Sequence, residues 1–229
     1  MSVLIRYLLP VVLCALPGYA LAHEAGSLPL GSFIGGLTHP VLGPDHFLAM
    51  VSVGILSAQI GGRAIWTVPA TFVVVMALGG ALGMLEVPLS AVELGIAFSV
   101  LVLGIAIAVD RRLPLMLAMR AVGFFAVFHG YAHGTEMPLV AEPVRYAAGF
   151  MSGTAALHVL GVIIGDVPRH YASGKLVLRL IGGGIAGIGI DGDACRALGP
   201  LKPGKTIGRQ RRPDRRAEQR VGRQCGLDA

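Results

Sequence analysis

Charged residues are scarce in this chain of 229 residues: Asp, Glu, Lys and Arg make up 14% of it, against 54% hydrophobic residues. A water-soluble domain of this length needs far more polar residues to cover its surface. Apolar runs of about 20 residues recur instead, and a helix of that length crosses a bilayer. We therefore expect an all-α fold, a polytopic bundle of membrane helices surrounded by lipid.

Cysteine is also rare, and Cys14, Cys195 and Cys225 lie in the first or last segment of the chain. They provide neither a disulfide framework nor a thiolate metal site. The formal net charge of +6 is local as well. Residues 190–229 hold ten Lys and Arg and five Asp and Glu, whereas the remaining residues hold nine and eight. The basic excess therefore belongs to a tail and does not indicate nucleic-acid binding.

Residues 1–22 have the pattern of a secretory signal peptide, with a basic start, an apolar stretch over residues 7–16, and Ala20 and Ala22 as the small residues of a cleavage site. An uncleaved first helix is the alternative. Cleavage would leave His23 at the mature amino terminus, where the free amine and the imidazole are both nitrogen donors for a divalent ion. The alternative reading of this residue is an incidental exposed histidine.

Six membrane spans are predicted after the signal peptide. They cover residues 31–58, 64–84, 89–109, 113–133, 143–165 and 175–190. Basic residues follow the first, third and fifth spans, and acidic residues occupy the other loops. Because basic loops mark the cytoplasmic side, we expect a bacterial inner-membrane protein with a periplasmic mature amino terminus.

The sixth predicted span is short for a membrane crossing, and residues 191–229 are polar, rich in Arg and without periodicity. We expect this tail to be disordered. If the sixth span crossed the membrane, the basic tail would lie on the periplasmic side, against the charge rule. One hypothesis is a cytoplasmic tail after an incomplete last helix. The hypothesis we favour is a reading-frame shift near residue 190, so that residues 23–190 form the bundle.

The first span contains the octapeptide HPVLGPDH, residues 39–46. Ionisable groups in an apolar segment are costly unless paired or bound to a metal, so they indicate a functional site. His39 and His46 would share one face of a continuous helix, but the prolines and glycine between them favour a break that lines a cavity. Asp45 is then either a direct metal ligand or the group that orients an imidazole.

The fourth span ends in FHGYAHGTE, residues 128–136. His129 and His133 are four residues apart and Glu136 follows three later, so all three project to one side of a helix. Two imidazoles and a carboxylate suit Ni, Co, Zn or Fe(II). Since two spans each carry histidines and a carboxylate, the pattern predicts a metal site. His158, in the middle of the fifth span, either completes this site or hydrogen-bonds a neighbouring helix.

At these motifs the sequence resembles the HupE/UreJ family, membrane proteins associated with hydrogenase and urease maturation. The family pattern has a signal peptide, a mature amino terminus that begins with His, HPxxGxDH in the first helix and FHGxAHGxE later. The similarity covers about residues 1–190. It implies a secondary permease, not an enzyme, that takes up nickel, or alternatively cobalt, across the inner membrane for hydrogenase or urease assembly.

The resemblance also implies the metal route and the partners. The route would be lined by His39, Asp45, His46, His129, His133 and Glu136, and the reading of the residues themselves adds His23 and His158 as further candidates. The divalent ion would be cargo and no prosthetic group is expected. Three other functions remain open: an intramembrane metalloenzyme, a haem-binding electron carrier, and a non-transporting accessory protein that holds metal for a partner.

Overall fold

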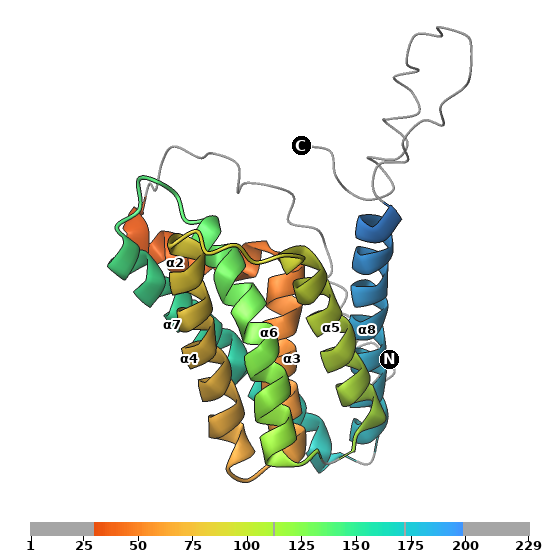
Figure 1. The fold of residues 1–229 in the computed structure, drawn as a ribbon. Helices are drawn as coiled ribbons and strands as arrows, with labels where there is room; N and C mark the ends of the chain where they lie inside the picture. The colour runs from red at the N-terminus through yellow and green to blue at the C-terminus, as the bar shows by residue number, and fades with distance from the viewer. Residues whose placement is uncertain (1–29, 112, 172, 199–229) are drawn as a thin grey trace, which may run out of the picture.

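In the computed structural model of the chain the described residues are 30–111, 113–171 and 173–198, with only the backbone given for residue 169 and residues 191–198. This part of the chain is helical and contains no strand, which confirms the predicted all-α class (Figure 1). The predicted signal peptide, His23 and the predicted tail beyond residue 198 lie outside the described residues.

The helices follow one another as antiparallel segments joined by short loops. They are α2 (Gly31–Leu42), α3 (Pro44–Ile60), α4 (Ala64–Met84), α5 (Val92–Val109), α6 (Leu115–Thr135), α7 (Pro143–Asp166), the 3-10 helix η1 (Val167–His170) and α8 (Gly174–Leu198). Four of them, α4 to α7, are long and apolar enough to cross a membrane, and the bent pair α2 and α3 makes a fifth if it counts as one span.

The sixth predicted span corresponds to α8, which is helical but is not among these membrane-crossing candidates. Lys175 and Arg179 lie in its first turns, so its apolar stretch is diluted by charge. The helix also continues to Leu198, past the predicted end near residue 190. Loss of hydrophobicity ends a membrane span but does not by itself end a helix.

The first predicted span is broken at Gly43, where α2 and α3 meet at a bend of 85°. Gly43 has an extended backbone and Pro44 begins α3. Proline disfavours a helical conformation in the residue before it, yet it fits the first turn of a helix, so the chain leaves α2 and starts α3 at this point. In Figure 1, α2 lies across one end of the bundle while α3 runs through its middle.

Helix α3 is the central element, since its residues from Ala49 to Ala58 are all buried and it packs against α4, α5, α6 and α7. Its closest contact is with α7. A Cβ atom added at Gly54 would lie 2.7 Å from the Cα atom of Gly161 and nearer still to the carbonyl oxygen of His158. Glycine therefore lets the two backbones touch at this level, which fixes the depth of His158 in the bundle.

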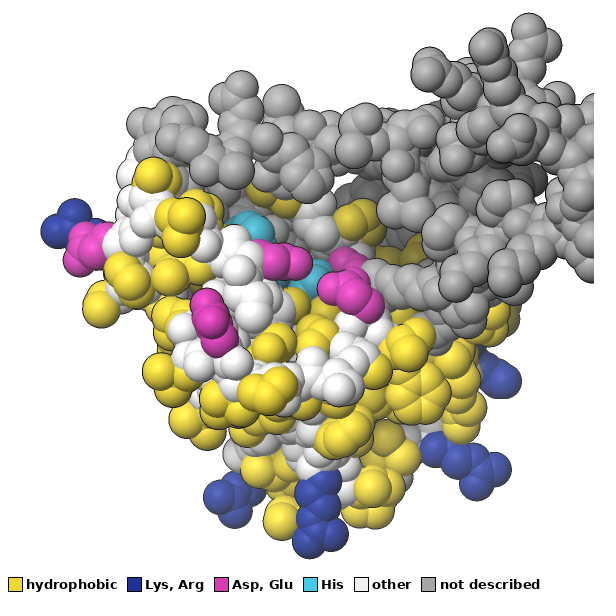
Figure 2. Space-filling model, turned by 45° about the horizontal axis from the view of Figure 1, so that its top comes forward, with side chains coloured by type: hydrophobic (Ala, Val, Ile, Leu, Met, Phe, Trp, Pro, Cys, Tyr) yellow, Lys and Arg dark blue, Asp and Glu magenta, His cyan; other side chains and the backbone are white. Residues whose placement is uncertain are grey.

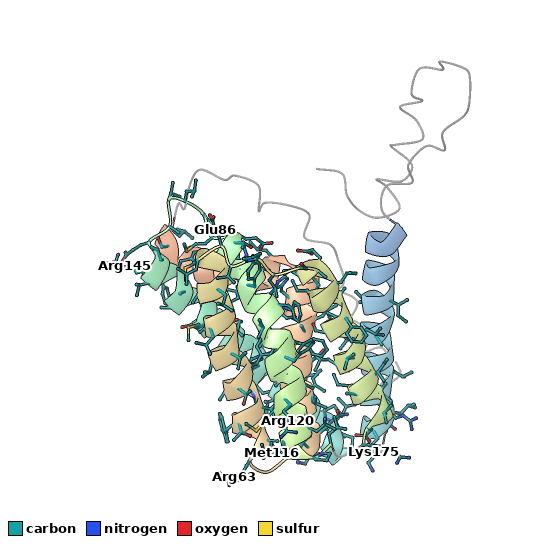
Figure 3. All side chains as sticks on the ribbon, viewed as in Figure 1. Arg63, Glu86, Met116, Arg120, Arg145 and Lys175 are labelled. Atoms are coloured by element: carbon teal, nitrogen blue, oxygen red, sulfur yellow. The ribbon has the colours of Figure 1, made fainter. Side chains whose placement is uncertain are left out.

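Charge divides the bundle into two ends, which we call acidic and basic. The acidic end, where α4 and α6 finish, carries Glu86, Glu93, Glu136 and Glu142. Figure 3 shows Arg63, Arg120 and Lys175 at the opposite, basic end. Arg145 lies at the acidic end, where its Nε is 3.0 Å from a carboxylate oxygen of Glu142. The alternating basic and acidic loops of the sequence thus collect at opposite ends of a membrane bundle.

Candidate metal site

Four imidazoles from three helices form a continuous row, which we call the histidine row. His39 lies in the last turn of α2, His46 in the first turn of α3, and His129 and His133 lie one turn apart on α6. The ring centroids are 4.9 Å apart between His39 and His133, 4.2 Å between His133 and His46, and 4.9 Å between His46 and His129. The structure therefore brings the two sequence motifs together in one place.

The outer end of the histidine row is completed by Glu136, the residue that caps α6. Its Oε2 lies 3.6 Å from Nε2 of His39 and 4.0 Å from Nδ1 of His133. One ligand atom from each of these three residues lies within 4.8 Å of the other two. Figure 2 shows histidine side chains at this end flanked by acidic side chains.

The histidine row runs from an exposed outer end to a fully buried inner end. The Glu136 side chain is 50% exposed and that of His39 is 24% exposed, whereas that of His133 is 5% exposed. His46 is buried and His129 is fully buried. The arrangement is therefore a line of donor atoms that starts at the surface and ends inside the bundle.

Asp45 determines which nitrogen of His46 is available as a ligand. Its Oδ1 accepts the backbone N–H of His46 at 2.9 Å and lies 2.9 Å from Nδ1 of the same residue. Because a carboxylate only accepts hydrogen bonds, we assign the ring proton to Nδ1 and the lone pair to Nε2. Nε2 is buried and has no hydrogen-bond partner among the described residues. Of the two roles left open by the sequence, the geometry favours the orienting one.

Ser99 on α5 determines in a similar way which ring nitrogen of His129 is available as a ligand. Its Oγ lies 2.6 Å from the carbonyl oxygen of Ile96 and 2.8 Å from Nε2 of His129. Since the hydroxyl donates its proton to the carbonyl, it accepts from Nε2–H, and the lone pair of His129 is then on Nδ1. That atom is buried without a hydrogen-bond partner in the part of the chain that is described. A single serine in an apolar helix gives no sequence signal for this role.

The repeated His-Gly pairs of α6 have a packing explanation. A Cβ atom added at Gly130 would lie 2.9 Å from the backbone nitrogen of Gly80, and one added at Gly134 would lie 3.1 Å from the Cα atom of Gly80. Successive helical residues point about 100° apart, so the glycines contact α4 while the histidines before them face α3. Each His-Gly pair therefore places an imidazole and lets α6 approach α4 closely.

Aromatic and apolar side chains of α7 and α4 surround the histidine row. The ring of Phe150 lies 4.1 Å from that of His133, and the ring of Tyr146 lies 5.9 Å from that of His39. A cavity lined mainly by methionine, glycine and aromatic side chains adjoins His133 between α4, α6 and α7. This shell excludes water, and the imidazole nitrogens share it with one further buried polar atom, the hydroxyl of Tyr146, which has no hydrogen-bond partner among the described residues.

His158 lies outside the histidine row. Its ring packs perpendicular to that of Phe72, at 5.3 Å and 89°, and Phe72 in turn lies 5.6 Å from His129. Neither nitrogen of His158 has a hydrogen-bond partner within the described residues. Within the described residues, His158 therefore neither joins the histidine row nor hydrogen-bonds a neighbouring helix, the two arrangements that the sequence left open. Phe72 is one aromatic residue in an apolar helix and gives no sequence signal.

The donor set consists of imidazole nitrogens with one carboxylate. This combination suits borderline divalent ions such as Ni²⁺, Co²⁺ and Zn²⁺ better than the hard ions Mg²⁺ and Ca²⁺. Buried imidazole nitrogens without a partner are costly in an apolar environment, and a bound cation would compensate that cost. The chemistry of the donor set thus fits the binding of such an ion.

Comparison with known proteins identifies related chains. The sequence matches the family described as HupE / UreJ protein over residues 11–191. It is also similar to Protein HupE of Rhizobium leguminosarum bv. viciae, with 42% identity over 172 residues, which cover 75% of this chain and 88% of that relative. No solved structure matches the chain.

Proposed function

This chain belongs to the HupE/UreJ family, and from that premise we propose that it is a secondary permease that takes up nickel across the bacterial inner membrane. The observation that supports transport most strongly is the histidine row. It begins at an exposed carboxylate and ends at a fully buried imidazole, so it leads an ion into the bundle. A site that only held an ion would need one set of ligands, not a line of them.

The proposed orientation places the acidic end in the periplasm and the basic end in the cytoplasm. Basic residues are retained on the cytoplasmic side of inner-membrane proteins, and the described basic end carries Arg63, Arg120 and Lys175. Glu136 and His39 would then meet the ion on its arrival. Uptake, rather than export, follows from this orientation together with the opening of the histidine row at the acidic end.

The proposed path uses the spacing of the rings. Consecutive ring centroids are 4.2 to 4.9 Å apart, so an ion can bind the next imidazole before it leaves the previous one. Replacement of the hydration shell by several weak ligands in sequence allows an ion to enter without being trapped. Asp45 and Ser99 fix the tautomers of His46 and His129, so that the free ring nitrogen of each carries a lone pair and not a proton.

The proposed cargo is nickel, with cobalt as the alternative, and the proposed destination is the assembly of hydrogenase or urease. The donor atoms suit both ions. Nickel and the maturation role rest on membership of the family, whose description names HupE and UreJ. The ion is cargo in this proposal, so it occupies the histidine row only in transit.

The test is accumulation of radioactive nickel by cells that produce the protein or its variants. We expect His46→Ala and His133→Ala to reduce uptake at least tenfold, because each removes one imidazole from the middle of the row. The matched control is His170→Ala, an exposed histidine on η1 whose Nδ1 lies 3.2 Å from the carbonyl oxygen of Asp166. Wild-type uptake in both variants would refute the assignment of the site. Nickel binding without accumulation would indicate an accessory protein that holds metal.

A further inference from the structure

His158 is a buried imidazole that the histidine row does not use. Its side chain lies in the interior of the bundle, 2% exposed, on the face of α7 that packs against α3 and α4. Neither Nδ1 nor Nε2 has a hydrogen-bond partner among the residues described. A histidine that only filled space would be replaced by an apolar residue at no loss of packing, whereas this one keeps two polar atoms in an apolar environment.

The position of His158 along the membrane continues the histidine row inward. His129 is six residues from the acidic end of α6, about 9 Å at the helical rise, while His158 is fifteen residues from the acidic end of α7, about 22 Å. Phe72 lies between these levels, twelve residues from the acidic end of α4, about 18 Å. One aromatic ring therefore separates the innermost imidazole of the row from a deeper one.

Two weak donor atoms lie near Phe72, on the side of the histidine row. Thr154 precedes it by one turn of α7, is fully buried, and its Oγ1 lies 3.9 Å from Sδ of Met76. Met76 follows Phe72 by one turn of α4. A hydroxyl, a thioether and an imidazole thus lie along the inner contact of α4 with α7. By the same residue counts, Thr154 and Met76 lie between the levels of His129 and His158, so weak donor atoms occupy the stretch that separates the two imidazoles.

We propose that His158 is a second, inner binding station for the transported divalent ion, separated from the histidine row by the ring of Phe72. This inference rests on the proposed permease function and adds a second station to it. The ion moves from Nδ1 of His129 past the ring of Phe72 to a nitrogen of His158, at a level about 12 Å from the basic end of α7. Loading at the histidine row and release from His158 are then separate steps.

The experiment compares nickel uptake by His158→Phe and His158→Cys, normalised to the protein present in the membrane. Phenylalanine keeps the ring that packs on Phe72 but removes both nitrogens, whereas cysteine keeps a metal ligand and loses the ring. We expect His158→Phe to lower uptake at least tenfold and His158→Cys to retain several times more activity. Equilibrium binding of nickel to the purified full-length His158→Phe protein should stay within twofold of wild type, because the histidine row is intact.

Uptake by His158→Phe within twofold of wild type would overturn the inference, and so would a His158→Cys protein no more active than His158→Phe. Loss of equilibrium binding in His158→Phe would also overturn it, since the two stations would not be separate. If His158→Phe does not accumulate in the membrane, His158→Gln replaces it under the same criteria. Wild-type cells that accumulate no more nickel than cells with His46→Ala would contradict the permease function itself, so the two failures are distinguishable.

Discussion

Replacement of Asp45 by asparagine should weaken nickel transport without removing any ring of the histidine row. The carboxylate accepts two hydrogen bonds from His46, one from the backbone and one from Nδ1, both at 2.9 Å. A hydrogen bond to a charged group contributes about 1.5–3 kcal/mol, and one between neutral groups about 1 kcal/mol. The difference, about 0.5–2 kcal/mol in holding the tautomer, corresponds to roughly a 2- to 30-fold loss of affinity.

That range agrees with the roughly 10- to 100-fold loss that follows when the group orienting a metal-binding histidine is removed. The assay is the dependence of initial nickel uptake on nickel concentration in cells with equal amounts of protein. Asp45→Asn should raise the concentration for half-maximal uptake by about tenfold. The control is Glu142→Gln, which removes one negative charge from the same acidic end but pairs with Arg145 and not with a histidine.

Equal effects of Asp45→Asn and Glu142→Gln would show that Asp45 acts through surface charge, and the tautomer argument would then be wrong. Uptake by Asp45→Asn equal to wild type at every nickel concentration would refute it more directly. If Asp45→Asn abolishes uptake completely, and no other hydrogen-bond acceptor at this position restores it, the carboxylate is itself a metal ligand.

Three further predictions concern other parts of the site. Gly130→Ala should lower the free energy of unfolding by about 1–3 kcal/mol and lower the thermal midpoint of the purified protein, because the added methyl group meets the backbone of α4. The control is Gly123→Ala on the same helix, where the added Cβ atom would lie 3.6 Å from its nearest neighbour, and the thermal midpoint should not fall. Ser99→Ala should lower uptake severalfold, because the ring proton of His129 is then no longer held on Nε2, and Ser99→Thr, which keeps a hydroxyl, should lower uptake less. Equal uptake by the two variants would contradict the role of the hydroxyl. His39→Ala should raise the nickel concentration for half-maximal uptake more than it lowers the maximal rate, since this side chain lies at the exposed end; a pure loss of maximal rate would place it elsewhere on the path.

The sequence predicts the parts of this fold that depend on local chemistry. Apolar length predicts α4 to α7 to within a few residues, because a bilayer sets the length of a crossing helix. The prolines and glycine of HPVLGPDH indicate the break at Gly43, because their backbone preferences are local. The i, i+4 spacing of His129 and His133 places them on one face for the same reason.

What the sequence does not predict arises from contacts between helices. Ser99 and Phe72 belong to α5 and α4, and their contacts with His129 depend on how those helices pack against α6. The end of α8 at Leu198 is also missed, because hydropathy reports where a membrane span would end and not where the helix stops. His158 is recognised as unusual from its position in an apolar span, but its separation from the histidine row by Phe72 is a property of tertiary packing.

The most direct test of the central claim, that the histidine row conducts a divalent ion across the membrane, is transport by the purified full-length protein in sealed liposomes that contain a nickel-sensitive dye. No other protein is present, so transport cannot come from a partner. Wild type should give a saturable dye signal on addition of external nickel, His170→Ala should match it, and His46→Ala should reduce the rate at least tenfold. A wild-type protein that binds nickel but gives no more dye signal than empty liposomes would contradict the account.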